Sequence, residues 1–180
     1  MKRYSKFTKS KFNLLEKNDQ REPLRILDLR CNQLLEVSET ICMLKQLVVL
    51  ELAGNQLRNL PDLRSLNRLT HLNLSANRFQ ILPNSIRLLK RLEVLNLHGN
   101  LLQTFPDDIL GCLKHLSHLT LCKNQLKNLP DCLARWPRTF TIFLEDNQLT
   151  QDEIKKWESC LEQVHRDHPK LGPKIYFSEF

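Results

Sequence analysis

The sequence predicts an α/β solenoid, a single arc in which short parallel strands alternate with helical or extended outer segments. A leucine-rich pattern of eleven residues returns six times, each time with an asparagine followed by a hydrophobic residue two places on. These asparagines are Asn32, Asn55, Asn77, Asn100, Asn124 and Asn147. They are spaced 22 to 24 residues apart, and a fixed period of roughly 20 to 50 residues is typical of stacked repeats. Because one repeat cannot bury its own apolar side, neighbouring repeats must pack together.

We expect a short strand at the same place in every copy. In the second copy Leu50 and Leu52 share one strand face, whereas Val49 and Glu51 share the other, since successive strand residues alternate. The leucines are expected to point inward, and the strands to form one parallel sheet on the concave side of the arc. The asparagine amide is expected to bond backbone groups at the bend, which is a structural role.

The second half of most copies resembles the leucine-rich repeat family, in its Leu-Pro-x-x-Ile-x-x-Leu form. The motif is clearest at Leu82-Pro83, followed by Ile86 and Leu89. Related starts are Leu60-Pro61, Phe105-Pro106 and Leu129-Pro130. The resemblance covers residues 24–150 and implies a leucine-rich repeat arc with short helical or 3₁₀ outer segments. This form is found in cytoplasmic proteins and in some secreted bacterial effectors.

The two ends of the chain are expected to cap the solenoid, because an open end would expose core. Residues 1–23 are predicted to be a basic N-terminal cap, 24–150 six repeats, and 151–180 a helical C-terminal cap and tail, all in one structural domain. Thr150 with Glu153 three residues later is typical of a capping box at a helix start. The aromatic tail from Ile175 to Phe180 is interpreted as packing back on the domain, with partner binding as the alternative.

Cysteine usage and hydropathy indicate a reducing compartment. The N-terminus lacks the apolar run of a signal peptide, and no run of eighteen apolar residues is present. The cysteines are scattered along the repeats rather than clustered in the caps, which favours reduced thiols. They are Cys31, Cys42, Cys112, Cys122, Cys132 and Cys160. We therefore expect a cytoplasmic protein, or one that acts in a host cytoplasm if it is a secreted bacterial effector.

The formal net charge of +7 is concentrated near the N-terminus. Residues 1–21 hold seven Lys and Arg against Glu16 and Asp19, and such an arm is able to bind nucleic acid or an anionic membrane. The arginines of the repeats fall mostly at outer or loop positions and are interpreted as a solvated face. They include Arg58, Arg64, Arg68, Arg78, Arg87 and Arg91.

The concave sheet is the expected contact surface for a protein partner. The predicted contact residues are Ile26, Asp28, Arg30, Val49, Glu51, His71, Asn73, Val94, Asn96, His98, His118, Thr120, Phe143 and Glu145. Asp28 and Glu51, next to Ile26 and Val49, favour a basic or mixed apolar partner. Phe143 and Arg30 belong to residue types that often anchor interfaces.

Catalysis, cofactors and metal binding are not expected. His98 and Cys122 share a column on neighbouring strands, but a zinc site needs three or four converging ligands. An open sheet also lacks the enclosing pocket that a Cys–His nucleophile requires. The sequence therefore predicts a monomeric, non-catalytic protein-interaction module. Binding of nucleic acid or a membrane surface through the N-terminal arm is the alternative.

Overall fold

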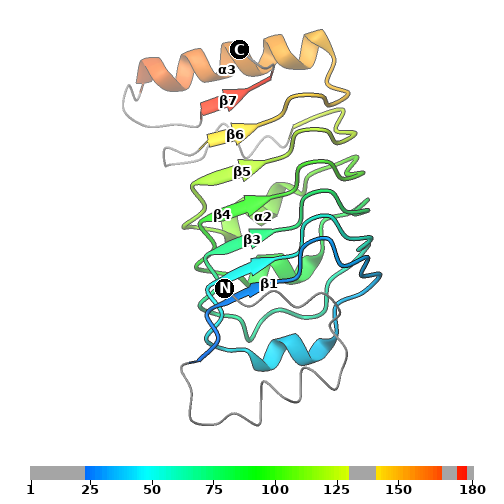
Figure 1. Ribbon diagram of the computed structural model, residues 1–180. Helices are drawn as coiled ribbons and strands as arrows, with labels where there is room; N and C mark the ends of the chain where they lie inside the picture. Colours follow the sequence, from blue (N-terminus) through cyan, green and yellow to red (C-terminus); the bar gives the residue numbers. More distant parts are fainter. Residues whose placement is uncertain (1–22, 130–140, 168–173, 178–180) are drawn as a thin grey trace.

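The computed structural model describes residues 23–129, 141–167 and 174–177 of the 180-residue chain. Seven parallel strands follow one another in chain order along a single sheet (Figure 1). They are β1 (Ile26–Asp28), β2 (Val49–Glu51), β3 (His71–Asn73), β4 (Val94–Asn96), β5 (His118–Thr120), β6 (Thr141–Phe143) and β7 (Lys174–Tyr176). The α/β solenoid predicted from the repeats is confirmed. The basic N-terminal cap predicted for residues 1–23 lies outside the described residues, apart from Pro23.

The strands pair in a register that stacks the inward leucines. Leu50 lies opposite Leu72, and Leu72 opposite Leu95, on successive strands. All three are almost completely shielded from solvent, as are the second inward leucines, such as Leu52 and Leu97. The expected inward register is therefore correct, and the core is a continuous column of leucines from one end of the arc to the other.

Buried asparagines tie each repeat to the one before it. The Asn100 Oδ1 accepts from the Phe79 N–H at 3.1 Å, and its Nδ2 donates to the Leu74 and Leu97 carbonyls, each at 3.0 Å. Asn55, Asn77, Asn124 and Asn147 repeat this arrangement. Each amide satisfies backbone groups that the bend leaves unpaired, which is the structural role expected of it.

The residue before each of these asparagines takes a left-handed backbone conformation. Its φ lies between 51° and 67° in all six repeats. The six residues are Cys31, Gly54, Ala76, Gly99, Lys123 and Asp146. Only two are glycines, so four repeats place a side chain where the backbone disfavours one.

The outer segments differ from repeat to repeat. The first and third repeats carry 3₁₀ helices, η1 (Glu39–Met43) and η2 (Asn84–Leu88), and the longer fourth repeat carries the α-helix α2 (Asp107–Cys112). The second repeat is the shortest and crosses its outer side in turns alone. Segment length thus sets the outer conformation, while the inner strands stay the same.

The C-terminal end is capped by the helix α3 (Gln151–Asp167) and the strand β7 (Figure 1). The Thr150 hydroxyl accepts from the Glu153 N–H at 3.2 Å, as a helix N-cap should. The Glu153 carboxylate does not complete the expected capping box but accepts from the Leu129 N–H and the Trp157 Nε1–H. Trp157 is 2% exposed. The Glu153 carboxylate therefore joins a buried side chain of the cap to the backbone of the preceding repeat.

The aromatic tail packs back on the domain where it is described. β7 pairs in parallel with β6, and Ile175 lies opposite Ile142 in the inward column. The tail therefore takes the place of one more repeat strand at the end of the sheet. No helix in the described parts of the chain is both long and apolar enough to span a bilayer.

Candidate functional site

The concave sheet carries three rows of side chains between and beside the inward leucines. The first row is Ile26, Val49, His71, Val94, His118 and Thr141. The second row is Asp28, Glu51, Asn73, Asn96, Thr120 and Phe143. The third row follows each strand by two residues and is Arg30, Ala53, Ser75, His98, Cys122 and Glu145. All the predicted contact residues lie on these rows, so the parallel register brings them onto one surface about 4.8 Å apart from strand to strand.

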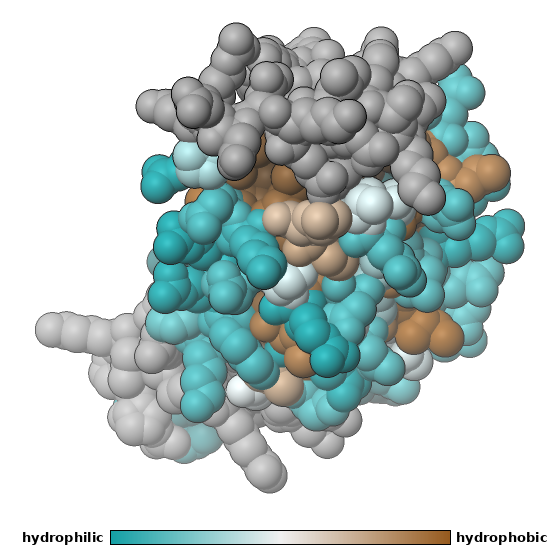
Figure 2. All heavy atoms as spheres, turned by 90° about the horizontal axis from the view of Figure 1, so that it is seen from below, coloured by the Kyte–Doolittle hydropathy of each residue, from teal (hydrophilic) through white to brown (hydrophobic). Residues whose placement is uncertain are grey.

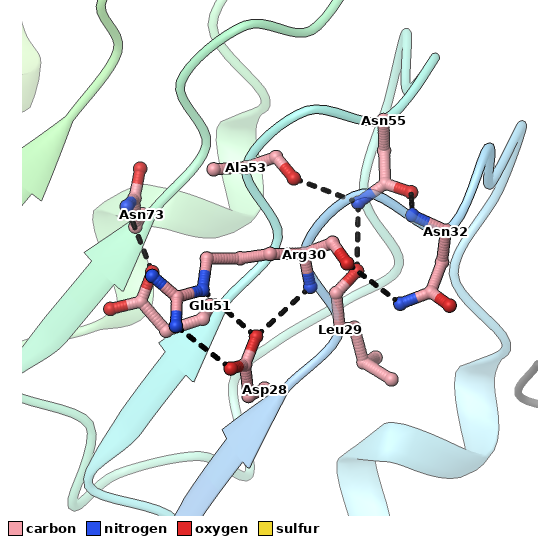
Figure 3. A network of polar contacts seen from close by, with 8 residues as sticks. All are labelled: Asp28, Leu29, Arg30, Asn32, Glu51, Ala53, Asn55 and Asn73. Atoms are coloured by element: carbon pink, nitrogen blue, oxygen red, sulfur yellow. Dashed lines mark hydrogen bonds and ion pairs between the residues drawn. The ribbon is translucent and has the colours of Figure 1, made fainter. Parts of the chain in front are cut away.

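Asp28 and Arg30 satisfy each other. The Arg30 Nη2 and Nε donate to the two Asp28 carboxylate oxygens at 2.9 and 3.0 Å, and the Arg30 N–H adds a third bond at 3.1 Å (Figure 3). These bonds raise the pKa of the Arg30 guanidinium. Asp28 is only 4% exposed. Its charge is thus matched within its own repeat, and contact between Asp28 and a basic partner stays a prediction.

Internal hydrogen bonds continue along the second row. The Asn73 Nδ2 donates to the Glu51 carboxylate at 2.8 Å (Figure 3), and its Oδ1 accepts from the Ser75 N–H and hydroxyl. The Asn96 Oδ1 accepts from the His98 N–H at 3.0 Å. The Asn73–Glu51 bond joins two repeats, whereas the bonds to Ser75 and His98 stay within one repeat, so several polar groups of this row are already engaged.

At the C-terminal end of the sheet, Phe143 and Glu145 are also engaged. The Phe143 ring stacks on Tyr176 of β7, with centroids 5.1 Å apart. The Cys122 thiol donates to the Glu145 carboxylate across neighbouring repeats. Burial and the Glu145 carboxylate raise the pKa of Cys122 to about 12. Cys122 is therefore a protonated thiol at neutral pH, unsuited to act as a nucleophile or a metal ligand.

The first row is the part of the face with the fewest internal bonds. Ile26 is 48% exposed, and Val49 and Val94 are partly exposed. The His71 Nδ1 lies 2.8 Å from the Thr70 hydroxyl, and the His118 Nδ1 lies 2.9 Å from the Ser117 hydroxyl. Two apolar side chains, Ile26 and Val49, therefore lie next to each other, and from Val49 to His118 apolar and imidazole side chains alternate along adjacent strands.

The hydroxyls determine which nitrogen of each imidazole faces outward as an acceptor. The Ser117 hydroxyl donates to the Glu93 carbonyl at 3.0 Å, and the Thr70 hydroxyl donates to the Val48 carbonyl at 3.3 Å. Because a hydroxyl has one proton, each must accept from the Nδ1–H of the histidine beside it. Neutral His71 and His118 then keep an acceptor lone pair on Nε2, available to a donor on a partner.

The sequence contains a signal for this arrangement that composition alone does not reveal. Leu69-Thr70-His71-Leu72 and Leu116-Ser117-His118-Leu119 share the motif Leu-(Thr/Ser)-His-Leu, two repeats apart. The hydroxyl residue precedes the strand and so lies within reach of both the carbonyl of the preceding repeat and the following imidazole. His98 and Cys122, by contrast, do not form a site, and no group of three metal-ligating side chains occurs within the described residues.

The comparison with known families agrees with the repeat geometry. The leucine rich repeat pattern matches residues 22–79 and 83–149, which together are more than half of the chain. The chain belongs to the leucine-rich repeat family. No curated protein matches this leucine-rich repeat chain.

Among solved structures, this leucine-rich repeat protein is similar to an internalin (inlF) from Listeria monocytogenes strain 4b F2365. The TM-score is 0.60 at 23% sequence identity, and the match covers 81% of this chain. It covers 39% of the internalin chain. At this identity the likeness shows the shared leucine-rich repeat fold alone.

Proposed function

We propose that this protein is a non-catalytic interaction module that binds a protein partner through the concave sheet, as an adaptor, a regulator or a host-directed effector. Leucine-rich repeat domains generally mediate protein–protein interaction and are typically not enzymes. The observation that supports the proposal most is the first row, where the partly exposed Ile26, Val49 and Val94 lie beside the exposed His71 and His118.

Rigidity is the physical advantage of this surface. The strands are fixed by ladder bonds and by the asparagine amides, so little conformational freedom is lost when a partner binds. The Asp28–Arg30 pair and the Glu51–Asn73 bond lie in the neighbouring second and third rows and restrict the side chains next to the first row. A partner that fits would offer an apolar contact to Ile26, Val49 and Val94 and N–H or O–H donors to the two imidazoles.

The cysteines favour a reducing compartment for this activity. Cys31, Cys42, Cys112, Cys122 and Cys160 are all free thiols, while Cys132 lies outside the described residues. Free thiols in several repeats are typical of proteins that work in a cytoplasm. We therefore propose a cytoplasmic site of action, in the producing cell or in a host cell.

The test is a quantitative affinity pulldown with two matched double variants. Ile26→Lys with Val94→Lys places two charges in the first row, whereas Leu35→Lys with Ile81→Lys places the same charges on exposed apolar residues away from the sheet. We expect a protein captured by the unaltered chain to be retained by the second variant and lost with the first. Loss with both variants, or with neither, would remove the first row as the binding surface.

Removal of residues 1–21 in the same experiment tests the alternative function, which is binding of nucleic acid or a membrane surface through the basic N-terminal arm. These residues hold seven Lys and Arg, and binding through them would be lost on their removal and weakened steeply by salt. If the partner is lost when residues 1–21 are removed but is still captured by the variant with two first-row lysines, the function belongs to the basic arm instead.

A further inference from the structure

The basic residues of the repeats are not spread evenly but gather at one edge of the sheet. Each strand from β2 to β5 is preceded by a two-residue turn, closed by a backbone bond between leucines, such as the Leu92 N–H to the Leu89 carbonyl at 3.0 Å. The equivalent bonds in the other three turns are 2.9 to 3.0 Å long. The exposed basic residues in these turns are Lys45, Arg68, Lys90, Arg91, Lys114 and His115, which we call the turn stripe.

The basic side chains of the turn stripe are not paired with acidic groups in the parts of the chain that the structure describes. No hydrogen bond or ion pair joins any of these six side chains to another residue in the described parts of the chain. Other arginines of the repeats behave differently, since Arg64 pairs with Asp62 and Arg87 pairs with Asp108 on the outer side. The arginines interpreted from the sequence as one solvated face therefore fall into two groups. Arg64 and Arg87 are paired on the outer side, whereas Arg68 and Arg91 belong to the turn stripe.

The opposite edge of the sheet provides an internal comparison. The turns that follow the strands carry Arg30 and Lys123 but also Glu145 and Asp146. Their charges balance, and Arg30 is paired with Asp28. Since the same fold carries acidic as well as basic residues at that edge, the excess of basic residues in the turn stripe is a property of this sequence and not of the repeat.

We propose that the turn stripe binds an acidic segment of a protein partner, lying along the arc beside the concave face. The turns stack in register with the strands, so a stripe two residues wide runs across four repeats. A narrow acidic chain can follow it, whereas the exposed Glu93, two residues beyond Arg91, would repel a broad anionic surface.

Two neighbouring features favour a peptide over a nucleic acid or a membrane. Met43 and Leu88, both exposed, lie next to the turns on the outer side and offer apolar contacts that a phosphate backbone cannot use. They are separated by Ser65. On the face seen from below in Figure 2, hydrophobic residues form separate patches among hydrophilic ones. The aromatic platforms on which single-stranded bases stack are absent from the described turns.

The proposal is tested by fluorescence anisotropy with a labelled glutamate-rich peptide containing interspersed leucines. One variant reverses three stripe charges, Arg68→Glu, Lys90→Glu and Arg91→Glu. Its control reverses three exposed basic residues elsewhere, Arg58→Glu, Arg78→Glu and Lys127→Glu, with the same change in net charge. Residues 1–21 are present in both, so their attraction for the peptide cancels in the comparison.

We expect the stripe variant to bind the peptide about tenfold more weakly or worse, and the control to stay within about threefold of the unaltered chain. Circular dichroism melts should show both variants folded. Equal losses in the two variants, or no binding by the unaltered chain, would overturn the proposal. A single-stranded oligonucleotide or a phosphatidylserine vesicle that binds more tightly through the same three residues would also overturn it, by assigning the stripe another partner. The first-row lysine variant is expected to keep peptide binding, which separates this site from the concave-face function.

Discussion

At the scale of single residues, the buried asparagines show how a polar side chain stabilises a core made of leucine. An amide offers one acceptor and two donor hydrogens, and Asn100 uses them on three backbone groups of two repeats. Asn32 stands at the start of the series, is only partly buried, and among the described residues its Nδ2 donates to the Arg30 carbonyl alone. An asparagine of this motif is therefore expected to contribute more to the free energy of unfolding inside the array than at its start.

Replacing Asn100 by alanine should cost about 3 kcal/mol or more of unfolding free energy, because three buried backbone groups lose their partners. Asn32→Ala is the matched control and should cost less than about 1 kcal/mol. Urea denaturation monitored by circular dichroism measures both values. Similar costs for the two variants would show that water replaces the amide and that the ladder contributes little.

Cys122 offers a second prediction at this scale. Its pKa is raised to about 12 by burial and by the Glu145 carboxylate, so the thiol should react with iodoacetamide far more slowly at pH 8.5 than the exposed Cys31. The folded pKa lies above that of an unfolded cysteine, about 8.5. The associated stability is therefore intact below pH 8.5 and declines as the pH rises toward 12.

The control for this prediction is Glu145→Gln, which removes the carboxylate charge. It should lower the pKa of Cys122 and speed its alkylation, measured by mass spectrometry of the digested protein. Alkylation of Cys122 at the rate of Cys31 in the unaltered chain would contradict the hydrogen-bonded thiol.

At the scale of the element, the sequence predicts the features that recur in every repeat but not the contacts that occur only once. The inward positions of Leu50 and Leu52 follow from a period of two, and the helix α3 follows from Thr150 and the spacing of its apolar residues. The Asp28–Arg30 pair and the Phe143–Tyr176 stack do not follow from any period. They depend on side-chain rotamers and, for Tyr176, on a strand contributed by the tail.

The left-handed turn before each asparagine is an element whose cost can be measured. Gly54 and Gly99 occupy equivalent positions with φ of 67° and 65°. A Cβ at position 99 would meet only ordinary contacts, whereas a Cβ at position 54 would lie 2.9 Å from the Cys31 sulfur. Gly99→Ala therefore reports backbone strain alone, and Gly54→Ala reports strain plus a displaced thiol.

We expect Gly99→Ala to cost about 1 kcal/mol and Gly54→Ala about 1 kcal/mol more, measured by chemical denaturation. In a Cys31→Ala background the excess cost of Gly54→Ala should disappear, because the crowded atom is gone. An excess that persists without the Cys31 sulfur would place its cause in the backbone of the turn.

At the scale of the whole molecule, the structure is an array in which each repeat contacts its neighbours. The leucine column, the asparagine ladder and the parallel register all connect adjacent repeats. Stability in such an array is close to a sum of repeat terms and nearest-neighbour terms. A destabilising substitution in the central repeat and one in a cap should therefore loosen different parts of the array, even when they lower the free energy of unfolding by similar amounts.

Leu95→Ala and Trp157→Ala provide that comparison. Leu95 lies fully buried in the central strand β4, and Trp157 is the buried anchor of α3. Each truncation should cost about 2 to 5 kcal/mol. In hydrogen exchange, Trp157→Ala should release the Leu144 N–H, bonded to the Tyr176 carbonyl, and leave the Leu52 N–H, bonded to the Asn73 carbonyl, protected. Leu95→Ala should accelerate exchange at both amides, because it weakens the interfaces on either side of β4. If Trp157→Ala accelerated both amides equally, the arc would unfold as one cooperative unit, and the cap would stabilise the whole array and not its last repeat alone.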